Sequence, residues 1–155
     1  MTSPQKFFLF ILRLSMGWMF FYAGIAKVLD PAWSAAGYLK GATFLPWLYQ
    51  IFSQPHLLPY VDFANKWGLT LLGISLMLGL FVRLSSLLGV ILMALYYFAI
   101  PGFNFPHPNA HSYIVDEHVI YIAVLFFFAA IKAGRFLGAD GKRAHHESGF
   151  RKWLG

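Results

Sequence analysis

Four apolar stretches, each long enough to form a helix that crosses a bilayer, constrain this chain more than any other feature. They cover residues 6–29, 63–82, 84–100 and 113–131. A spanning helix needs about 20 mostly apolar residues, and it satisfies its backbone hydrogen bonds internally. Of the 155 residues, 59% are hydrophobic and only 12% are charged, about half the charge of an average soluble domain. The sequence therefore predicts an all-α integral membrane protein, built as a four-helix bundle.

The connections between these stretches predict the rest of the architecture. The second and third stretches meet around Arg83, which indicates a tight antiparallel hairpin. The segment 30–62 is rich in aromatic residues and poor in charge, so we expect an additional helical segment at the outer membrane interface. Residues 1–137 are expected to form one transmembrane domain, followed by a basic cytoplasmic tail at 138–155.

The distribution of lysine and arginine predicts how the four stretches are oriented. With the N-terminus inside, nine of the 12 Lys and Arg residues lie on the inner side and three on the outer side. Cytoplasmic segments of membrane proteins carry this kind of positive excess. We therefore expect both termini in the cytoplasm. The net charge of +6 then belongs mainly to cytoplasmic segments that lie near anionic lipid headgroups. Nucleic acid is therefore not an expected partner.

The sequence contains no cysteine, which limits the chemistry that the chain can support. Disulfides, thiol redox chemistry, thiolate zinc sites and cysteine-bound iron–sulfur clusters are excluded. A redox function would need a bound electron carrier, and no covalent cofactor is expected. The sequence also lacks a nucleophile elbow, a phosphate-binding loop and a dinucleotide fingerprint.

One face of the first stretch carries a cation near each end and glycines between them. The residues within about 40° of one line on this helix are Arg13, Gly17, Phe20, Gly24 and Lys27. Glycines let a second helix approach closely. A cation inside a membrane is costly, so Arg13 is a candidate for ligand binding or for an internal ion pair. The alternative for Arg13 and Lys27 is snorkelling toward the headgroups.

Three adjacent ionisable residues, Asp116, Glu117 and His118, open the fourth stretch. Acidic residues in a first turn complement the helix dipole, and Ser112 is placed to cap this helix. That capping interpretation accounts well for one acid. It accounts less well for three ionisable residues that point about 100° apart, at least one of which should face the bundle. We therefore interpret Asp116, Glu117 and His118 as candidate catalytic residues.

Other residues on the same outer side extend this candidate site. Lys27 ends the first stretch there, which makes a pair between Lys27 and one of the carboxylates geometrically reasonable. Tyr121 follows one turn after Glu117 on the same helix face. Arg13, Lys27 and Tyr121 are accordingly the candidate ligand-binding residues.

Histidines near this cluster raise the alternative of a metal site. His107 and His111, together with His118 and a neighbouring carboxylate, supply ligand types that bind zinc or copper. However, His107 and His111 lie in a proline-rich loop without regular spacing to a helix. We therefore expect no metal.

Several short motifs, taken in order, resemble the DoxX/DoxD family of four-helix membrane proteins over about residues 12–140. The matching residues are Leu12-Arg13-Leu14, Gly17, Phe20-Phe21-Tyr22-Ala23-Gly24, Lys27, Ala36-Gly37-Tyr38-Leu39-Lys40-Gly41-Ala42, Asn65, Trp67-Gly68-Leu69, Gly79-Leu80-Phe81-Val82-Arg83, Asp116-Glu117-His118 and Ala133-Gly134-Arg135-Phe136-Leu137-Gly138-Ala139-Asp140. The DoxD branch resembles the membrane subunit of thiosulfate:quinone oxidoreductase, which works beside a second subunit. The resemblance implies a prokaryotic cytoplasmic membrane, a quinone ligand, and either a second redox subunit or a homo-oligomer.

The residues and the resemblance together predict a quinone-interacting membrane redox subunit. His118, Lys27 or Arg13 would donate hydrogen bonds to the quinone, and Asp116 or Glu117 would accept protons released on quinol oxidation. The alternative is a non-catalytic assembly or scaffold subunit of a larger complex. A solute carrier is disfavoured, because four short helices show no inverted repeat.

Overall fold

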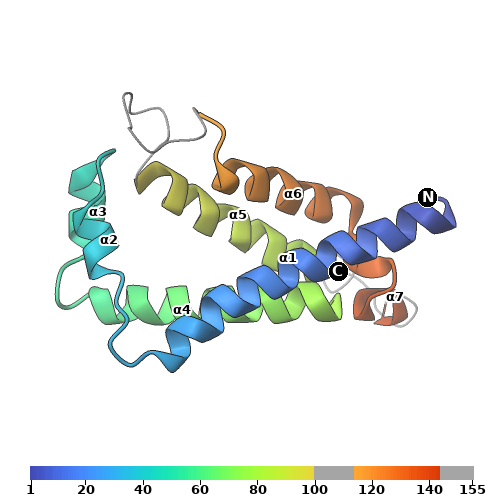
Figure 1. Cartoon of the computed structure of the whole chain (residues 1–155), viewed down its shortest axis with the longest axis horizontal. Helices are drawn as coiled ribbons and strands as arrows, with labels where there is room; N and C mark the ends of the chain where they lie inside the picture. Colours follow the sequence, from blue (N-terminus) through green and yellow to red (C-terminus); the bar gives the residue numbers. More distant parts are fainter. Residues whose placement is uncertain (100–113, 144–155) are drawn as a thin grey trace.

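The computed structural model of the chain describes residues 1–99 and 114–143, and within them all regular structure is helical (Figure 1). Its long helices are α1 (Ser3–Leu29), α4 (Leu58–Leu78), α5 (Val82–Ala99) and α6 (Glu117–Ile131). The shorter helices are α2 (Ala36–Lys40), α3 (Pro46–Phe52), the 3₁₀ turn η1 (Ala133–Arg135) and α7 (Ala139–Arg143). One long helix therefore overlaps each of the four predicted apolar stretches, although α1, α4 and α5 begin two to five residues earlier than predicted.

Two helices, α1 and α5, are long and apolar enough to cross a membrane, and α6 is a shorter apolar helix. Only a third of the residues in the most apolar part of α1 and of α5 are buried inside the chain. Large apolar side chains that point outward include Phe8, Trp18, Tyr22, Leu88 and Ile91. So extensive an apolar surface is unusual on a soluble monomer, and it suits contact with lipid.

Glycines bring α1 against α4, as their shared helix face predicts. A Cβ atom at Gly24 would collide with the backbone of Thr70, and one at Gly73 would collide with the backbone of Phe21. Gly17 is similarly close to the backbone of Met77. The two helices therefore cross in direct backbone contact, an arrangement that small residues permit in membrane proteins. Helices α5 and α6 form a second packed pair, which α4 joins through α5.

The predicted hairpin between the second and third stretches is present, but its turn lies earlier in the chain. Helix α4 ends at Leu78 and α5 begins at Val82, so the turn occupies residues 79–81 instead of the region around Arg83. Gly79 explains the shift because it adopts a left-handed conformation with φ of 67° at the helix end. Glycine takes this conformation without the steric cost that a Cβ atom imposes.

Helix α6 begins at Glu117 and not at residue 113, because Asp116 caps it. The Asp116 carboxylate accepts hydrogen bonds from the backbone N–H groups of His118 and Val119. The preceding Ile114 has a φ of 63°, which does not continue a right-handed helix. Asp116 is thus the N-cap of α6, and Ser112, which the capping interpretation named, lies outside the described residues.

The segment between α1 and α4 contains the short helices α2 and α3, where we expected an additional helical segment. These helices lie against the ends of α4 and α5 (Figure 1). A small apolar cluster beneath them includes Ala35, Leu39, Tyr49 and Ala99. Three hydrogen bonds reach the last turns of α5: Tyr38 Oη to Tyr96 O, Tyr49 Oη to Leu95 O, and Thr43 N to Ala99 O. The segment is thus fixed to the helices by its own hydrogen bonds.

The opposite end of the molecule is closed around Arg13, and we call Arg13, Ala133, Leu137 and Asp140 the Arg13 cluster. The Arg13 side chain is 1% exposed. Its guanidinium donates to the carbonyl oxygens of Ala133 at 3.0 Å and Leu137 at 2.9 Å. A Cβ atom at Gly79 would lie 2.5 Å from Arg13 Nη1, so glycine there leaves room for the guanidinium.

Asp140 belongs to this cluster, although the sequence placed it in the cytoplasmic tail. It is 5% exposed, and its carboxylate accepts hydrogen bonds from Phe81 N at 2.9 Å and Val82 N at 3.1 Å. The Asp140 N–H donates in turn to Gly79 O at 2.9 Å. We expected the tail to begin at residue 138, but the packed region continues past that point into α7. Residues 144–155 lie outside the described part of the chain.

Candidate ligand-binding site

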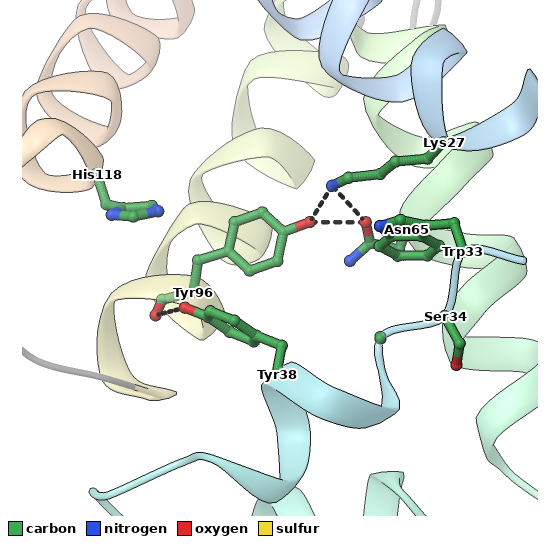
Figure 2. A pocket seen from close by; sticks show the side chains of 8 residues that line it. Lys27, Trp33, Ser34, Tyr38, Asn65, Tyr96 and His118 are labelled. Carbon is green, nitrogen blue, oxygen red and sulfur yellow. Dashed lines mark hydrogen bonds between the residues drawn. The ribbon is translucent and has the colours of Figure 1, made fainter. Parts of the chain in front are cut away.

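A cavity of about 330 Å³ lies where α1, α4, α5 and α6 meet the segment leading into α2 (Figure 2). Its lining residues are Lys27, Trp33, Ser34, Ala35, Tyr38, Asn65, Tyr96 and His118. They come from α1, from the segment that leads into and includes α2, and from α4, α5 and α6. We call this space the Lys27 cavity.

The Lys27 ammonium group is held by neutral side chains. Lys27 Nζ donates to Asn65 Oδ1 at 3.0 Å and to Tyr96 Oη at 3.3 Å, and Tyr96 Oη donates to Asn65 Oδ1 at 2.7 Å. Figure 2 shows Lys27, Tyr96 and Asn65 pointing toward one another from three helices. The ammonium also lies 4.9 Å from the centre of the Trp33 ring, within cation–π range. Among residues 1–99 and 114–143, the contacts that hold this cation are thus to uncharged groups.

The expected pair between Lys27 and a carboxylate is therefore wrong for the described residues. The reason lies at the start of α6, where Asp116 bends back to cap its own helix. Its Oδ1 accepts from His118 N at 3.0 Å and Val119 N at 3.2 Å. Its Oδ2 lies 2.9 Å from His118 Nδ1. The capping interpretation is thus confirmed for Asp116, and the same carboxylate also orients a histidine.

His118 is the member of the predicted catalytic trio that reaches the cavity. Its ring points toward Tyr96 (Figure 2), with the ring centres 5.9 Å apart. When Nδ1 donates to the Asp116 carboxylate, Nε2 carries a lone pair and can accept a proton. The geometry therefore combines a positioned imidazole with a supporting carboxylate. A catalytic role for either residue stays a prediction.

Glu117 and Tyr121 do not line the Lys27 cavity. Glu117 is exposed in the first turn of α6, where an acid complements the helix dipole. Tyr121 packs edge to face on Phe20, with ring centres 5.8 Å apart, and lies 6.5 Å from the His118 ring. The structure therefore places Tyr121 in the packing behind His118.

The metal question concerns the same short segment. Asp116, Glu117 and His118 each offer one ligand atom within 4.8 Å of the others. The Asp116 oxygens already bond to two backbone N–H groups and to the imidazole. The remaining histidines of the metal alternative, His107 and His111, lie outside the described residues, so the absence of a metal stays a prediction.

Arg13 is not brought together with the other candidate ligand-binding residues. It precedes Lys27 by 14 positions on α1, or about 21 Å at the rise of an α-helix. Two of its nitrogens bond to backbone carbonyls in the Arg13 cluster. Of the two alternatives for Arg13, the structure supports an internal partner, which consists of carbonyl groups with Asp140 nearby.

A second cavity of about 230 Å³ adjoins the first, and we call it the apolar cavity. Both cavities are lined by Ala35, Tyr38, Asn65 and Tyr96. The residues that line only the apolar cavity are Leu39, Tyr49, Phe52, Val61, Ala64, Leu92 and Leu95. A polar chamber therefore lies next to an apolar one, with a wall in common.

Tyr38 stands in the wall between the two cavities and fixes α2 to α5. Its hydroxyl donates to Tyr96 O at 2.8 Å, and its ring meets the Tyr96 ring edge to face. Burial raises the pKa of Tyr38 to about 12, with smaller contributions from Tyr49, Asp116 and Glu117. Tyr38 thus stays protonated, and able to donate, well above neutral pH.

A family model described as DoxX matches residues 8–102, more than half of the chain. The chain belongs to the DoxX family. No curated protein and no solved structure matched it. The DoxX region spans α1 to α5 and contains Lys27, Asn65 and Tyr96, whereas His118 lies beyond it.

Family membership makes this DoxX protein a membrane protein, in agreement with the two apolar helices. The sequence had singled out Lys27 and His118, and the structure brings both to one cavity. Asn65 had appeared only among the residues of the DoxX resemblance, although an amide inside a long apolar helix is a signal of the same kind. Tyr96 had been interpreted as an interface anchor, because tyrosines near helix ends usually anchor the membrane interface.

Proposed function

We propose that this DoxX-family membrane protein is a quinone-interacting redox subunit. In this proposal α1, α4, α5 and α6 span a prokaryotic cytoplasmic membrane as a four-helix bundle with both termini in the cytoplasm. The observation that carries the proposal is the pairing of the Lys27 cavity with the apolar cavity across a shared wall. A quinone has the same division, a ring with polar carbonyls and an apolar tail.

The Lys27 cavity supplies donors where a quinone ring needs them. Lys27 Nζ and the Asn65 amide nitrogen donate hydrogen bonds, and a quinone carbonyl accepts them. The ring is flanked by the aromatic side chains of Trp33, Tyr38 and Tyr96. Stacking between flat aromatic faces favours such a ring over an aliphatic ligand.

His118 and Asp116 handle the protons of the reaction. Reduction of a quinone by two electrons takes up two protons, and oxidation of the quinol releases them. The His118 imidazole exchanges a proton at Nε2, while the Asp116 carboxylate at Nδ1 stabilises the charged ring. The resemblance to the DoxD branch suggests thiosulfate as the electron donor. A second subunit would work beside this chain in the oxidation of thiosulfate.

The test begins with protein purified in detergent, which should retain quinone or bind an added quinone. With its partner subunit it should catalyse quinone-dependent oxidation of thiosulfate. His118→Ala should leave quinone affinity nearly unchanged and reduce the rate by about 100-fold or more, because a positioned acid–base group is lost.

The exposed His56 provides a matched control, since His56→Ala removes an imidazole that lines neither cavity. An unchanged rate in His118→Ala would remove this histidine from the mechanism. Wild-type protein that binds no quinone would contradict the proposal itself. Stoichiometric co-purification with a partner would then favour the assembly or scaffold role.

A further inference from the structure

The apolar cavity offers a ligand almost no polar contact of its own. Tyr38 and Tyr49 line it, but their hydroxyl groups already donate to backbone carbonyls of α5. Tyr38 donates to Tyr96 O at 2.8 Å, and Tyr49 donates to Leu95 O at 2.7 Å. Asn65 Oδ1 likewise accepts from Lys27 and Tyr96. None of the residues that line this cavity carries a formal charge. A charged or strongly polar occupant would therefore lose its hydration without compensation.

Three of the residues that line this cavity are exposed: Tyr38 of α2, Ala64 of α4 and Leu95 of α5. Leu39 and Tyr49, which line it as well, are buried. Next to Ala64, the Phe63 side chain is 65% exposed on the outer surface of α4. The cavity is thus open on an apolar flank between α4 and α5, which meets the hydrocarbon of the bilayer if these helices span it.

The position of the opening relative to the Lys27 cavity defines the shape of a suitable ligand. Asn65 and Tyr96 form part of both cavities, so a molecule can place one end beside Lys27 and the other end beside Ala64. The first end meets hydrogen-bond donors, and the second meets only apolar side chains. The combined space fits a polar head that bears a flexible hydrocarbon tail.

We propose that the apolar cavity is a lateral portal, through which the hydrocarbon tail of the quinone passes between α4 and α5 into the bilayer. This inference rests on the proposed quinone function and adds the tail as a recognised part of the substrate. The small side chain of Ala64 keeps the portal open. Entry occurs from the membrane, so the protein distinguishes quinones by their tails as well as by their rings.

The experiment compares a dimethoxy-methyl-benzoquinone with its decyl derivative as ligands for the purified protein. Wild-type protein should bind the decyl compound more tightly, because burying several methylene groups is favourable. Ala64→Trp fills the portal, and it should weaken binding of the decyl quinone by about tenfold or more while the tail-less quinone binds as before. Leu95→Trp narrows the same opening from α5 and should act in the same direction.

Leu71→Trp is the matched control, because Leu71 is 59% exposed on α4 and does not line either cavity. It should bind both quinones like the wild type. Unchanged tail-less binding in Ala64→Trp also shows that this variant is folded.

Equal weakening of both quinones by Ala64→Trp, or no weakening of either, would overturn the portal and leave the quinone function standing. A co-purified phospholipid that Ala64→Trp loses, but that the decyl quinone does not displace, would also overturn it by assigning the cavity to a lipid chain. Wild-type protein that binds neither quinone would reject the portal together with the proposed function.

Discussion

Arg13 and Lys27 lie on the same face of α1 and are both drawn into the protein, yet their surroundings differ. Arg13 is 1% exposed and bonds to the backbone carbonyls of Ala133 and Leu137, with Asp140 nearby. Lys27 is only partly buried and bonds to Asn65 and Tyr96 beside a cavity of about 330 Å³. One cation is enclosed by the chain itself, and the other borders space that a ligand can fill.

The chemistry of the two side chains accounts for this division. A guanidinium is planar, permanently charged and carries five donors, so it can satisfy several fixed carbonyls at once. An ammonium is a compact charge whose three donors can redirect toward a new acceptor. The comparison teaches that a buried cation in a membrane protein is a functional candidate when it also borders space that a ligand can fill, as Lys27 does.

The same substitution at both positions gives the sharpest test of the comparison, and the larger effect is expected at Arg13. Arg13→Met should lower the free energy of unfolding by about 3 kcal/mol, because it removes the charge-assisted hydrogen bonds to the carbonyls of Ala133 and Leu137 and the cation near Asp140. Denaturation in detergent measures this loss, and quinone affinity of the folded fraction should stay unchanged. The exposed Lys6 serves as control, since Lys6→Met should change stability by less than about 0.5 kcal/mol. If Arg13→Met had the same free energy of unfolding as the wild type, the Arg13 cluster would not contribute to the stability of the fold.

Lys27→Met should give the opposite pattern, with a smaller effect on stability and a direct effect on ligand binding. The methionine keeps most of the apolar stem, and Asn65 Oδ1 still accepts from Tyr96, so unfolding should change by less than about 1 kcal/mol. Quinone affinity should fall by about tenfold, since one charge-assisted hydrogen bond is lost. Equilibrium binding of quinone measures this affinity. Equal losses of stability in Lys27→Met and Arg13→Met would contradict the distinction between an enclosed Arg13 and a Lys27 that borders a cavity.

How much of this arrangement the sequence predicts depends on whether the partner is local. The four long helices, the hairpin and the glycine face follow from residue spacing, which is a property of one segment. The partner of Lys27 does not, because Asn65 and Tyr96 lie on two other helices. The expected pair between Lys27 and a carboxylate such as Asp116 rested on charge alone. The donors that Asp116 actually meets are the backbone N–H groups of its own helix.

Asp140 shows the same limit at the other end of the molecule. An acid in a basic, polar segment predicts a solvated tail, and its spacing to neighbouring residues carries no contrary signal. Its burial depends on two N–H groups of Phe81 and Val82 at the start of α5, which need partners once that helix end is enclosed. Those groups are almost 60 residues away in sequence, as the separations of 59 and 58 show.

The smallest expected effect concerns Tyr38, which attaches α2 beside the Lys27 cavity. Its folded-state pKa of about 12 lies above the ordinary tyrosine value of about 10, so its contribution to stability is complete below pH 10. That contribution should be lost as pH rises from about 10 to about 12, because the phenolate can no longer donate to Tyr96 O. Tyr38→Phe should remove this part of the alkaline decline, as measured by unfolding at increasing pH. Tyr60→Phe, at a largely exposed position, should decline like the wild type, and an identical decline in Tyr38→Phe would show that the phenol does not attach α2.

The long sequence separation within the Arg13 cluster has a consequence for how the protein is made. Arg13 and the carbonyl of Ala133 are 120 residues apart. At a synthesis rate of about 5–20 residues per second, the first helix waits roughly 6–24 s for that partner to emerge. During this interval the Arg13 guanidinium is charged, but the carbonyl groups that accept its hydrogen bonds in the folded protein have not yet been synthesised. The insertion machinery, lipid headgroups or water must solvate it, so the helix assembly is completed only after the segment that contains Ala133 and Leu137 has been synthesised.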